Sequence, residues 1–144
     1  KSRVITNPGV PPRPLSKIAS GGELSLLSLG LQVVLARHTE VPTLIFDEVD
    51  VGVSGAVAEA VGRKLRAVGG RGQVLAVTHL AQVAAQGHHH LHIRKETDES
   101  GAYTRVEPLA EADRVEEIAR ILGSSTITES TRANAREMLE GAGG

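Results

Sequence analysis

Apolar and polar positions along the chain follow two spacings, one typical of helices and one typical of strands. A helix is predicted from Ser20 to about His38, because apolar residues recur there every three or four positions. Its apolar face is formed by Leu24, Leu27, Leu31, Val34 and Leu35. Apolar residues also occupy much of the rest of this segment, so we expect the helix to be buried on most sides or covered by a partner.

Two short apolar runs predict strands. The first, "TLIFDE", covers 43–48, and the second, "QVLAVTH", covers 73–79. Their shortness favours strands that are buried on both faces of a sheet. Between them, Ser54 can cap a helix over 54–68, which two glycines then end. A strand, a helix and a strand with short links are typical of a parallel, right-handed crossover unit.

Shorter elements are predicted on both sides of this unit. A short strand over 1–6 precedes an extended loop over 7–17 that contains four prolines. After the second strand we expect a short helix over 80–85, an antiparallel hairpin of 90–96 with 102–109, and helices over 111–122 and 126–140. The elements predict an α/β fold in a single domain over 1–144, with a mostly parallel sheet flanked by helices and an antiparallel hairpin.

Composition and charge exclude several kinds of site and partner. The 16 Lys and Arg residues are balanced by 17 Asp and Glu, and the net charge of −1 gives no basic footprint for nucleic acid or an acidic membrane. The chain has no cysteine, which excludes disulfides and thiolate metal sites. No apolar run approaches the length of a membrane span, so we expect no membrane contact. Because the sequence begins at Lys1, we interpret it as a fragment or one lobe of a larger protein.

Candidate chemistry lies where the two central strands end. Asp47 and Glu48 end the first strand, and His79 ends the second. The carboxyl ends of parallel strands meet at one edge of the sheet, where ligands collect. There, Asp47 can bind Mg²⁺, Glu48 can orient or deprotonate a water, and His79 can donate to a phosphate oxygen. Taken one at a time, these residues fit a solvated strand end and a structural histidine better than a catalytic site.

A second candidate site lies where the first long helix begins, at "SGGE". Ser20 and Glu23 have the spacing of a capping box. This does not explain Gly21 and Gly22, each of which costs a helix about 0.5–1 kcal/mol relative to alanine. Glycines there let another group approach the free N–H groups closely, which suits a phosphate. A close helix crossing is the alternative explanation.

In their order and spacing, these motifs resemble those of the ABC-type ATPases. The matching segments are Ser20–Glu23 (signature loop), Leu44–Asp47 with Glu48 (Walker B and its glutamate), Asp50–Gly55 (D-loop) and His79 (switch histidine). The stretches "TNPGVPPRPLSKIASGGELS", "TLIFDEVDVGVSG", "VLAVTHLAQVAA" and "TRVEPLAEADRVEEIARILGS" are similar to the branch related to structural-maintenance-of-chromosomes (SMC) proteins. With them, the resemblance covers nearly the whole chain.

The resemblance implies the carboxyl-terminal lobe of an ATPase head that uses ATP and Mg²⁺ in double-strand break repair and recombination. The implied roles are a Mg²⁺ ligand for Asp47, catalysis for Glu48 and His79, and nucleotide binding for Ser20, Gly21, Gly22, Glu23, Asp50 and Ser54. The signature loop would serve the γ-phosphate of ATP held by the opposite subunit. The implied partners are an amino-terminal P-loop lobe of the same protein, a second head in a homodimer, and DNA through the full-length protein. The implied location is cytoplasmic and nucleoid-associated.

Several features limit this interpretation. No G-x-x-x-x-G-K-[ST] sequence and no sustained heptads occur, so the P-loop lobe and the coiled coil are absent from the chain, and we expect it alone to bind ATP poorly and not to hydrolyse it. Ala19 and Leu26 depart from many family sequences, which carry leucine and arginine there. The histidines of 88–92 fit an exposed stretch better than a metal site, and a basic cluster over 63–71 gives only weak support for DNA contact.

Two other interpretations remain open. One is a nucleotide-binding subunit of an ABC transporter, whose chemistry at the sheet edge would be the same. The "DEVDVGVSG" stretch and the proline-rich entry disfavour it. The other is a non-enzymatic interaction module that retains the motifs as relics, which the intact Asp47, Glu48 and His79 disfavour.

Overall fold

The computed structural model describes residues 3–4, 13–14, 21–36, 42–98, 101–123 and 126–143, with side chains from 26 to 35 and from 42 onward within these ranges. By internal contacts the chain divides into two units, Lys1–Thr78 and His79–Gly144, which are described one at a time. A single domain over 1–144 therefore stays a prediction.

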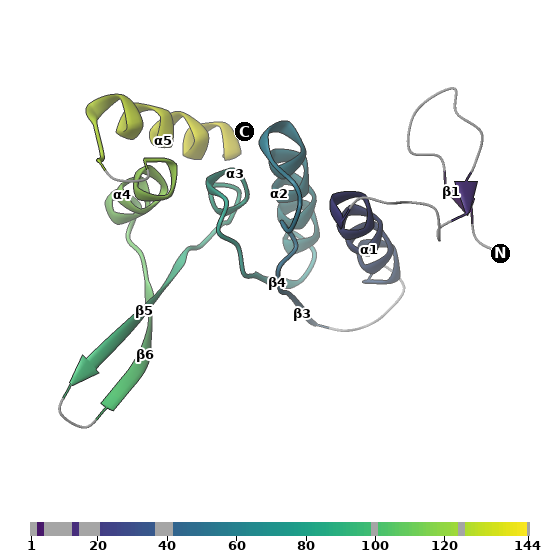
Figure 1. Ribbon diagram of the computed structural model, residues 1–144, viewed down its shortest axis with the longest axis horizontal. Helices are drawn as coiled ribbons and strands as arrows, with labels where there is room; N and C mark the ends of the chain where they lie inside the picture. The colour runs from purple at the N-terminus through teal and green to yellow at the C-terminus, as the bar shows by residue number, and fades with distance from the viewer. Residues whose placement is uncertain are drawn as a thin grey trace. The chain divides into compact units, whose positions relative to one another are not determined.

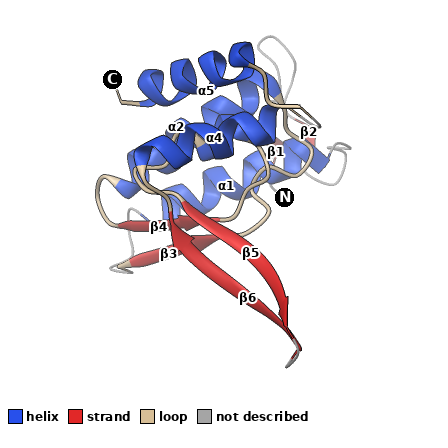
Figure 2. Cartoon of the chain, turned by 90° about the vertical axis from the view of Figure 1, so that its left-hand side faces the viewer, coloured by secondary structure: helices blue, strands red, loops and turns tan. Residues whose placement is uncertain are grey.

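The first unit contains the predicted strand–helix–strand arrangement. Its elements are β1 (Arg3–Val4), β2 (Arg13–Pro14), α1 (Gly21–Ala36), β3 (Thr43–Phe46), α2 (Gly55–Gly69) and β4 (Gln73–Ala76). Figure 1 labels all of these elements except β2, which Figure 2 labels. β1 and β2 pair antiparallel, and β2 falls in the segment that the sequence predicted as a loop. The helices and central strands begin and end close to where the apolar spacing placed them.

β3 and β4 pair in parallel, as predicted from the crossover pattern. The register runs from Thr43 opposite Gln73 to Phe46 opposite Ala76. At the amino ends, the Thr43 hydroxyl donates to Gln73 Oε1 at 2.9 Å. At the carboxyl ends, the Val77 N–H donates to the Phe46 carbonyl at 2.9 Å. The two strands therefore end at the same edge, which is where the sequence predicted the chemistry.

Only one face of the β3–β4 pair is buried. Phe46 is 3% exposed and Leu65 on α2 is 5% exposed, whereas Ile45 is 69% exposed. Leu75 lies opposite Ile45 in the register and is also exposed. The prediction that these strands are buried on both faces is wrong in this structure, because none of the described residues of the first unit covers Ile45 and Leu75 on that side of the sheet.

The helix α1 is likewise not buried on most sides in this chain. Leu29 is 6% exposed, but Leu31, Val34 and Leu35 are all more than half exposed. These three residues belong to the apolar face that the spacing predicted. Of the two outcomes expected for this helix, burial on most sides is not met by the described part of the first unit.

The second unit joins three helices to the predicted hairpin. Its elements are α3 (Ala81–Ala84), β5 (Leu91–Asp98), β6 (Gly101–Pro108), α4 (Glu111–Leu122) and α5 (Glu129–Ala142). A small core of Ala81, Ala85, Ile118, Ala119 and Ala135 joins the helices. Figures 1 and 2 show the β5–β6 hairpin extending away from these helices.

The hairpin has one apolar face and one polar face. Leu91, Ile93 and Val106 lie on one face by register and are each more than half exposed. On the other face, the Tyr103 hydroxyl donates to Glu96 at 2.7 Å, and Arg105 lies 3.5 Å from the same carboxylate. Within the described residues of the second unit, this apolar face is left exposed.

Two helix starts differ from the predictions in detail. α5 begins at Glu129 rather than at 126, because Thr128 and Thr131 form a reciprocal capping box. Ser54 occupies the N-cap position of α2 as predicted, but its side chain makes no capping hydrogen bond. Local spacing thus located both helices, while the capping contacts depended on side-chain geometry.

The α/β class is confirmed, with mixed helices and strands, a parallel pair and an antiparallel hairpin. The expectation of a mostly parallel sheet is too strong, because among the described strands only β3 and β4 pair in parallel. The antiparallel β1–β2 and β5–β6 pairs form separate two-stranded sheets.

Candidate functional site

An acidic edge follows directly from the end of β3. Phe46 is buried and anchors the strand, and the next two residues, Asp47 and Glu48, are both exposed. They are placed beside the end of β4 by the parallel register. The structure therefore presents both carboxylates to solvent at the carboxyl edge of the sheet, as the sequence predicted for this pair.

The backbone of Glu48 adopts an unusual conformation. Its φ of 52° is in the left-handed region, the one positive value for a residue other than glycine among those described. For a residue with a side chain, this conformation costs about 1–2 kcal/mol. Such strain persists only where the surroundings enforce it, and it concentrates at functional sites.

A tight turn after β3 produces this conformation. The Val51 N–H donates to the Glu48 carbonyl at 3.3 Å, and the Val53 N–H donates to the Asp50 carbonyl at 3.2 Å. Gly52 has a φ of 75°, which glycine adopts without the steric cost of a side chain. The turn leads into α2, with Ser54 exposed at the N-cap position.

Asp50 lies inside this turn and not on its surface. It is 2% exposed, and its carboxylate accepts a hydrogen bond from the Thr78 hydroxyl. The neighbouring Val49 is also buried, at 9% exposure. The sequence pointed to nucleotide contact for Asp50, whereas this burial favours a role within the fold.

The remaining predicted residues are less completely described. His79 is exposed and is the first residue of the second unit, so its place opposite Glu48 stays a prediction. Gly21, Gly22 and Glu23 form the first turn of α1, where N–H groups lack helical partners. Ser20 and the side chain of Glu23 lie outside the described residues, so the capping box also stays a prediction.

The acidic edge is compatible with Mg²⁺. Asp47 offers an exposed carboxylate, and this ion is bound through one or two carboxylates with substrate phosphates and waters. Within the described ranges, no group of three or more His, Cys, Asp and Glu side chains could hold a metal by itself. Asp47 would therefore hold the ion together with a nucleotide and not in an all-protein cage.

The histidines of 88–92 take part in the packing of the second unit. Arg114 is 8% exposed, and its guanidinium donates to the Gly87 carbonyl at 2.7 Å and the His88 carbonyl at 3.4 Å. His92 Nδ1 lies 3.3 Å from Glu117 Oε2. These contacts fasten the segment to α4 and favour a structural role over a metal site.

Two groups in this region have shifted pKa values. Burial, with the nearby charge of Arg114, lowers the pKa of His90 below its ordinary value. A hydrogen bond from Arg120 lowers the pKa of Glu117. Sequence analysis overlooked Arg114, although one signal was present: it precedes Ile118 by four positions and therefore shares the buried side of α4.

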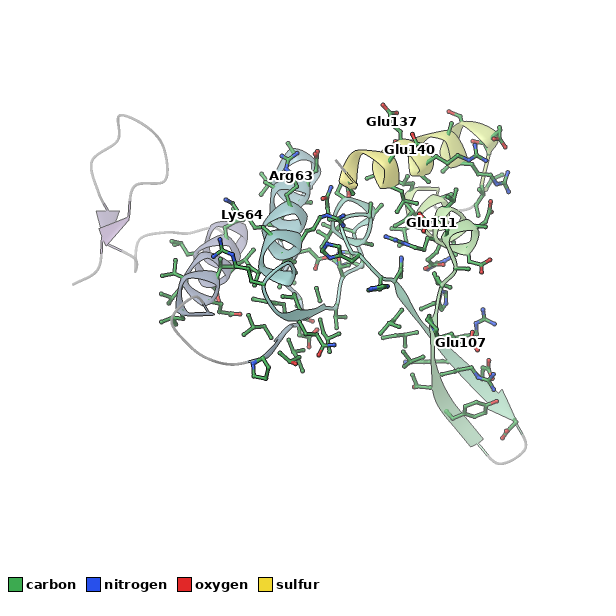
Figure 3. All side chains as sticks on the ribbon, turned by 180° about the vertical axis from the view of Figure 1, so that it is seen from behind. Arg63, Lys64, Glu107, Glu111, Glu137 and Glu140 are labelled. Carbon is green, nitrogen blue, oxygen red and sulfur yellow. The ribbon has the colours of Figure 1, made fainter. Side chains whose placement is uncertain are left out.

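The basic cluster is only partly available for binding. Figure 3 shows Arg63 and Lys64 on α2, and Arg63 pairs with Glu59 at 2.6 Å. In the second unit, the same figure shows Glu111, Glu137 and Glu140 on α4 and α5. The described side chains therefore add no strong basic surface to the balanced net charge.

Among the described helices, none combines the length and apolar character needed to cross a membrane.

Sequence comparison gives close relatives. The chain is 54% identical over 136 residues to the DNA repair protein RecN of Vibrio cholerae, a match that covers 94% of this chain and 24% of the relative. It is 53% identical over 135 residues to RecN of Haemophilus influenzae and 44% identical over 140 residues to RecN of Bacillus subtilis. No protein-family model matches the chain.

Structural comparison supports the same fold. The chain is similar, with a TM-score of 0.66 and 17% identity, to a solved structure reported as "Structural biochemistry of ATP-driven dimerization and DNA stimulated activation of SMC ATPases". The match covers 82% of this chain and 70% of that one. At this identity the likeness is evidence for the fold.

The chain spans about a quarter of the length of the RecN relatives, 24% for the Vibrio cholerae protein. The chain therefore belongs with the RecN DNA repair proteins, as a relative of their carboxyl-terminal portion.

Proposed function

We propose that this chain is the carboxyl-terminal half of an ATPase head that works in DNA double-strand break repair and recombination. The observation that carries the proposal is the exposed Asp47–Glu48 edge at the carboxyl ends of the parallel strands β3 and β4. The similarity to DNA repair proteins favours this function over that of a transporter subunit.

Each side chain at the edge has a proposed task. Asp47 holds Mg²⁺, which when bound neutralises the charge of the phosphates. Glu48 accepts a proton from the attacking water and orients it towards the γ-phosphate. His79 donates a hydrogen bond to a γ-phosphate oxygen. The left-handed backbone of Glu48 supports its assignment, because strain is retained where function requires a fixed geometry.

The start of α1 serves a different nucleotide. Gly21 and Gly22 let the free N–H groups of the first turn approach the γ-phosphate of ATP bound to a second head. Ser20 and Glu23 complete this loop, and the exposed Ser54 reaches the same nucleotide. Two heads then form a homodimer with ATP between them, and hydrolysis releases the contact.

An amino-terminal P-loop lobe of the same protein completes each head. The support is the apolar surface that the described residues of the first unit leave exposed. In the first unit Ile45, Leu75 and Val77 are 69%, 40% and 49% exposed. Exposed apolar patches of this kind mark interaction sites. The P-loop lobe would supply the phosphate cradle that this sequence lacks.

DNA binding belongs to the full-length protein in this proposal. The net charge of −1 and the two aromatic residues of this chain provide no independent nucleic-acid surface. The proposed location is the bacterial cytoplasm in association with the nucleoid.

The test is a Glu48→Gln substitution in a RecN-length protein that contains this chain. We expect ATP turnover to fall by at least about a hundredfold, which is the lower end of the usual contribution of a general base. ATP-bound dimers should accumulate, as measured by light scattering after size exclusion. Glu107→Gln, at a carboxylate on the hairpin, is the matched control and should leave turnover unchanged. An unchanged rate in the Glu48 variant would remove Glu48 from the mechanism.

A further inference from the structure

We propose that Asp50 is a positioning residue: through its hydrogen bond with Thr78, it holds Glu48 in its left-handed conformation at the edge of the sheet. This inference rests on the proposed function for the role of Glu48. It concerns a contact within the first unit and gives Asp50 a role other than binding nucleotide.

The argument begins with the strain at Glu48. Its φ of 52° is unfavourable for a residue with a side chain. The turn itself supplies two long backbone hydrogen bonds, of 3.3 Å from Val51 and 3.2 Å from Val53. Such bonds contribute about 0.5–1.5 kcal/mol each, which leaves little excess over the cost of the strain. A further anchor outside the turn is needed to keep this conformation dominant.

Thr78 is well placed to be that anchor. It follows β4 by two residues, and the Val77 N–H before it is bonded to the Phe46 carbonyl at 2.9 Å. Thr78 is therefore fixed relative to the end of β3, the strand that Glu48 follows. Its hydroxyl donates to the carboxylate of Asp50, two residues after Glu48. The bond thus ties the far side of the turn to the neighbouring strand.

The environment of Asp50 fits this role better than contact with a nucleotide. A carboxylate that is 2% exposed must be compensated by donors inside the protein, and the Thr78 hydroxyl is one. A carboxylate would also repel a phosphate unless a cation lay between them. The exposed Asp47 and Glu48 are oriented to solvent, whereas Asp50 is directed into the fold. The same bond fixes the chain immediately before His79.

Two measurements on a RecN-length protein containing this chain test the inference. The first is the hydrogen exchange rate of the Val51 and Val53 amides without nucleotide, which reports opening of the turn. The second is kcat and KM for ATP. Thr78→Val removes the donor, Thr78→Ser keeps a hydroxyl, and Asp50→Ala removes the acceptor. Thr43→Val is the matched control, because it removes a hydroxyl bond between the same two strands at their other end.

We expect exchange to accelerate about tenfold or more in Thr78→Val and Asp50→Ala, since hydrogen bonds to charged groups contribute on that scale. Turnover should fall about tenfold to a hundredfold with KM unchanged, because Glu48 is displaced and not removed. Thr78→Ser should restore both values, and Thr43→Val should leave both unaltered. Combining Asp50→Ala with Thr78→Val should cost less than the sum of the two single effects, because both variants remove the same bond.

Three results would overturn the inference. Unchanged exchange in Thr78→Val would show that the bond does not hold the turn. Faster exchange with normal kcat would show that holding the turn does not position Glu48 for the reaction. A raised KM for ATP in Asp50→Ala, with normal exchange, would return Asp50 to the nucleotide site. If the unsubstituted protein hydrolyses no ATP, the proposed function fails, while the exchange rates still decide whether Asp50 holds the Glu48 turn.

Discussion

The strain at Glu48 predicts an unusual order of stability among substitutions that remove its carboxylate. At most positions alanine is more stable than glycine by about 0.5–1 kcal/mol, because glycine loses more backbone freedom on folding. At a φ of 52° the left-handed conformation costs any residue with a Cβ about 1–2 kcal/mol, a cost that glycine escapes. The difference makes Glu48→Gly more stable than Glu48→Ala by roughly 0.5–1 kcal/mol.

The assay is the free energy of unfolding of the first unit, obtained from hydrogen exchange of β3 and β4 amides over a series of urea concentrations. Both variants lack the carboxylate, so the comparison isolates the backbone. The matched control is Ala67→Gly, at an exposed position within α2, where the variant should be less stable than the parent by about 1 kcal/mol. A Glu48→Ala protein at least as stable as Glu48→Gly would refute the assignment of strain.

Three further predictions concern the second unit. Arg114→Met should destabilise this unit by about 2–3 kcal/mol in thermal unfolding, because two backbone carbonyls lose a charged donor; a change below about 0.5 kcal/mol, typical of surface substitutions, would contradict the contact. The free energy of unfolding should fall with acidification, because the pKa of His90 is lowered in the folded state. The stability that this shift contributes is fully present above the ordinary histidine pKa of 6.5, and it is lost as the pH falls towards the pKa of the folded state. The lowered pKa of Glu117 adds a further loss of stability as the pH falls below the ordinary glutamate pKa of 4.5. Urea midpoints that stay constant from pH 7.5 to about pH 4 would contradict both pKa shifts. Thr128→Ala should lower the free energy of unfolding by about 1 kcal/mol through loss of its cap, as measured by calorimetry. Ser54→Ala in the first unit, at a cap position without the side-chain bond, is the comparison and should cost less.

Much of the fold could be predicted from local sequence. The apolar spacing located α1 and α4, and the two short runs located β3 and β4 with their parallel pairing. The failures have a common cause. Burial of β3 and β4 on both faces was inferred from the shortness of their apolar runs, but whether Ile45 is covered depends on residues far away in sequence or in another part of the protein.

The candidate site, too, was predicted from the sequence only in part. The sequence identified Asp47 and Glu48, because two acids after a buried strand are recognisable from spacing alone. It did not reveal the backbone conformation of Glu48, which arises from the turn. Nor did it reveal the bond between Asp50 and Thr78, which joins residues 28 positions apart.

The sequence by itself determined where the helices, the central strands β3 and β4 and the hairpin lie, although not β2, because side-chain spacing and chain-breaking residues act over a few neighbouring positions. It also determined which chemical groups stand at the strand ends. The tertiary structure alone decided which of those groups face solvent and which are buried, so that Asp47 is exposed and Asp50 is enclosed. The physical reason is that burial and hydrogen bonding depend on which distant segments the fold brings into contact, and local spacing carries no information about that choice.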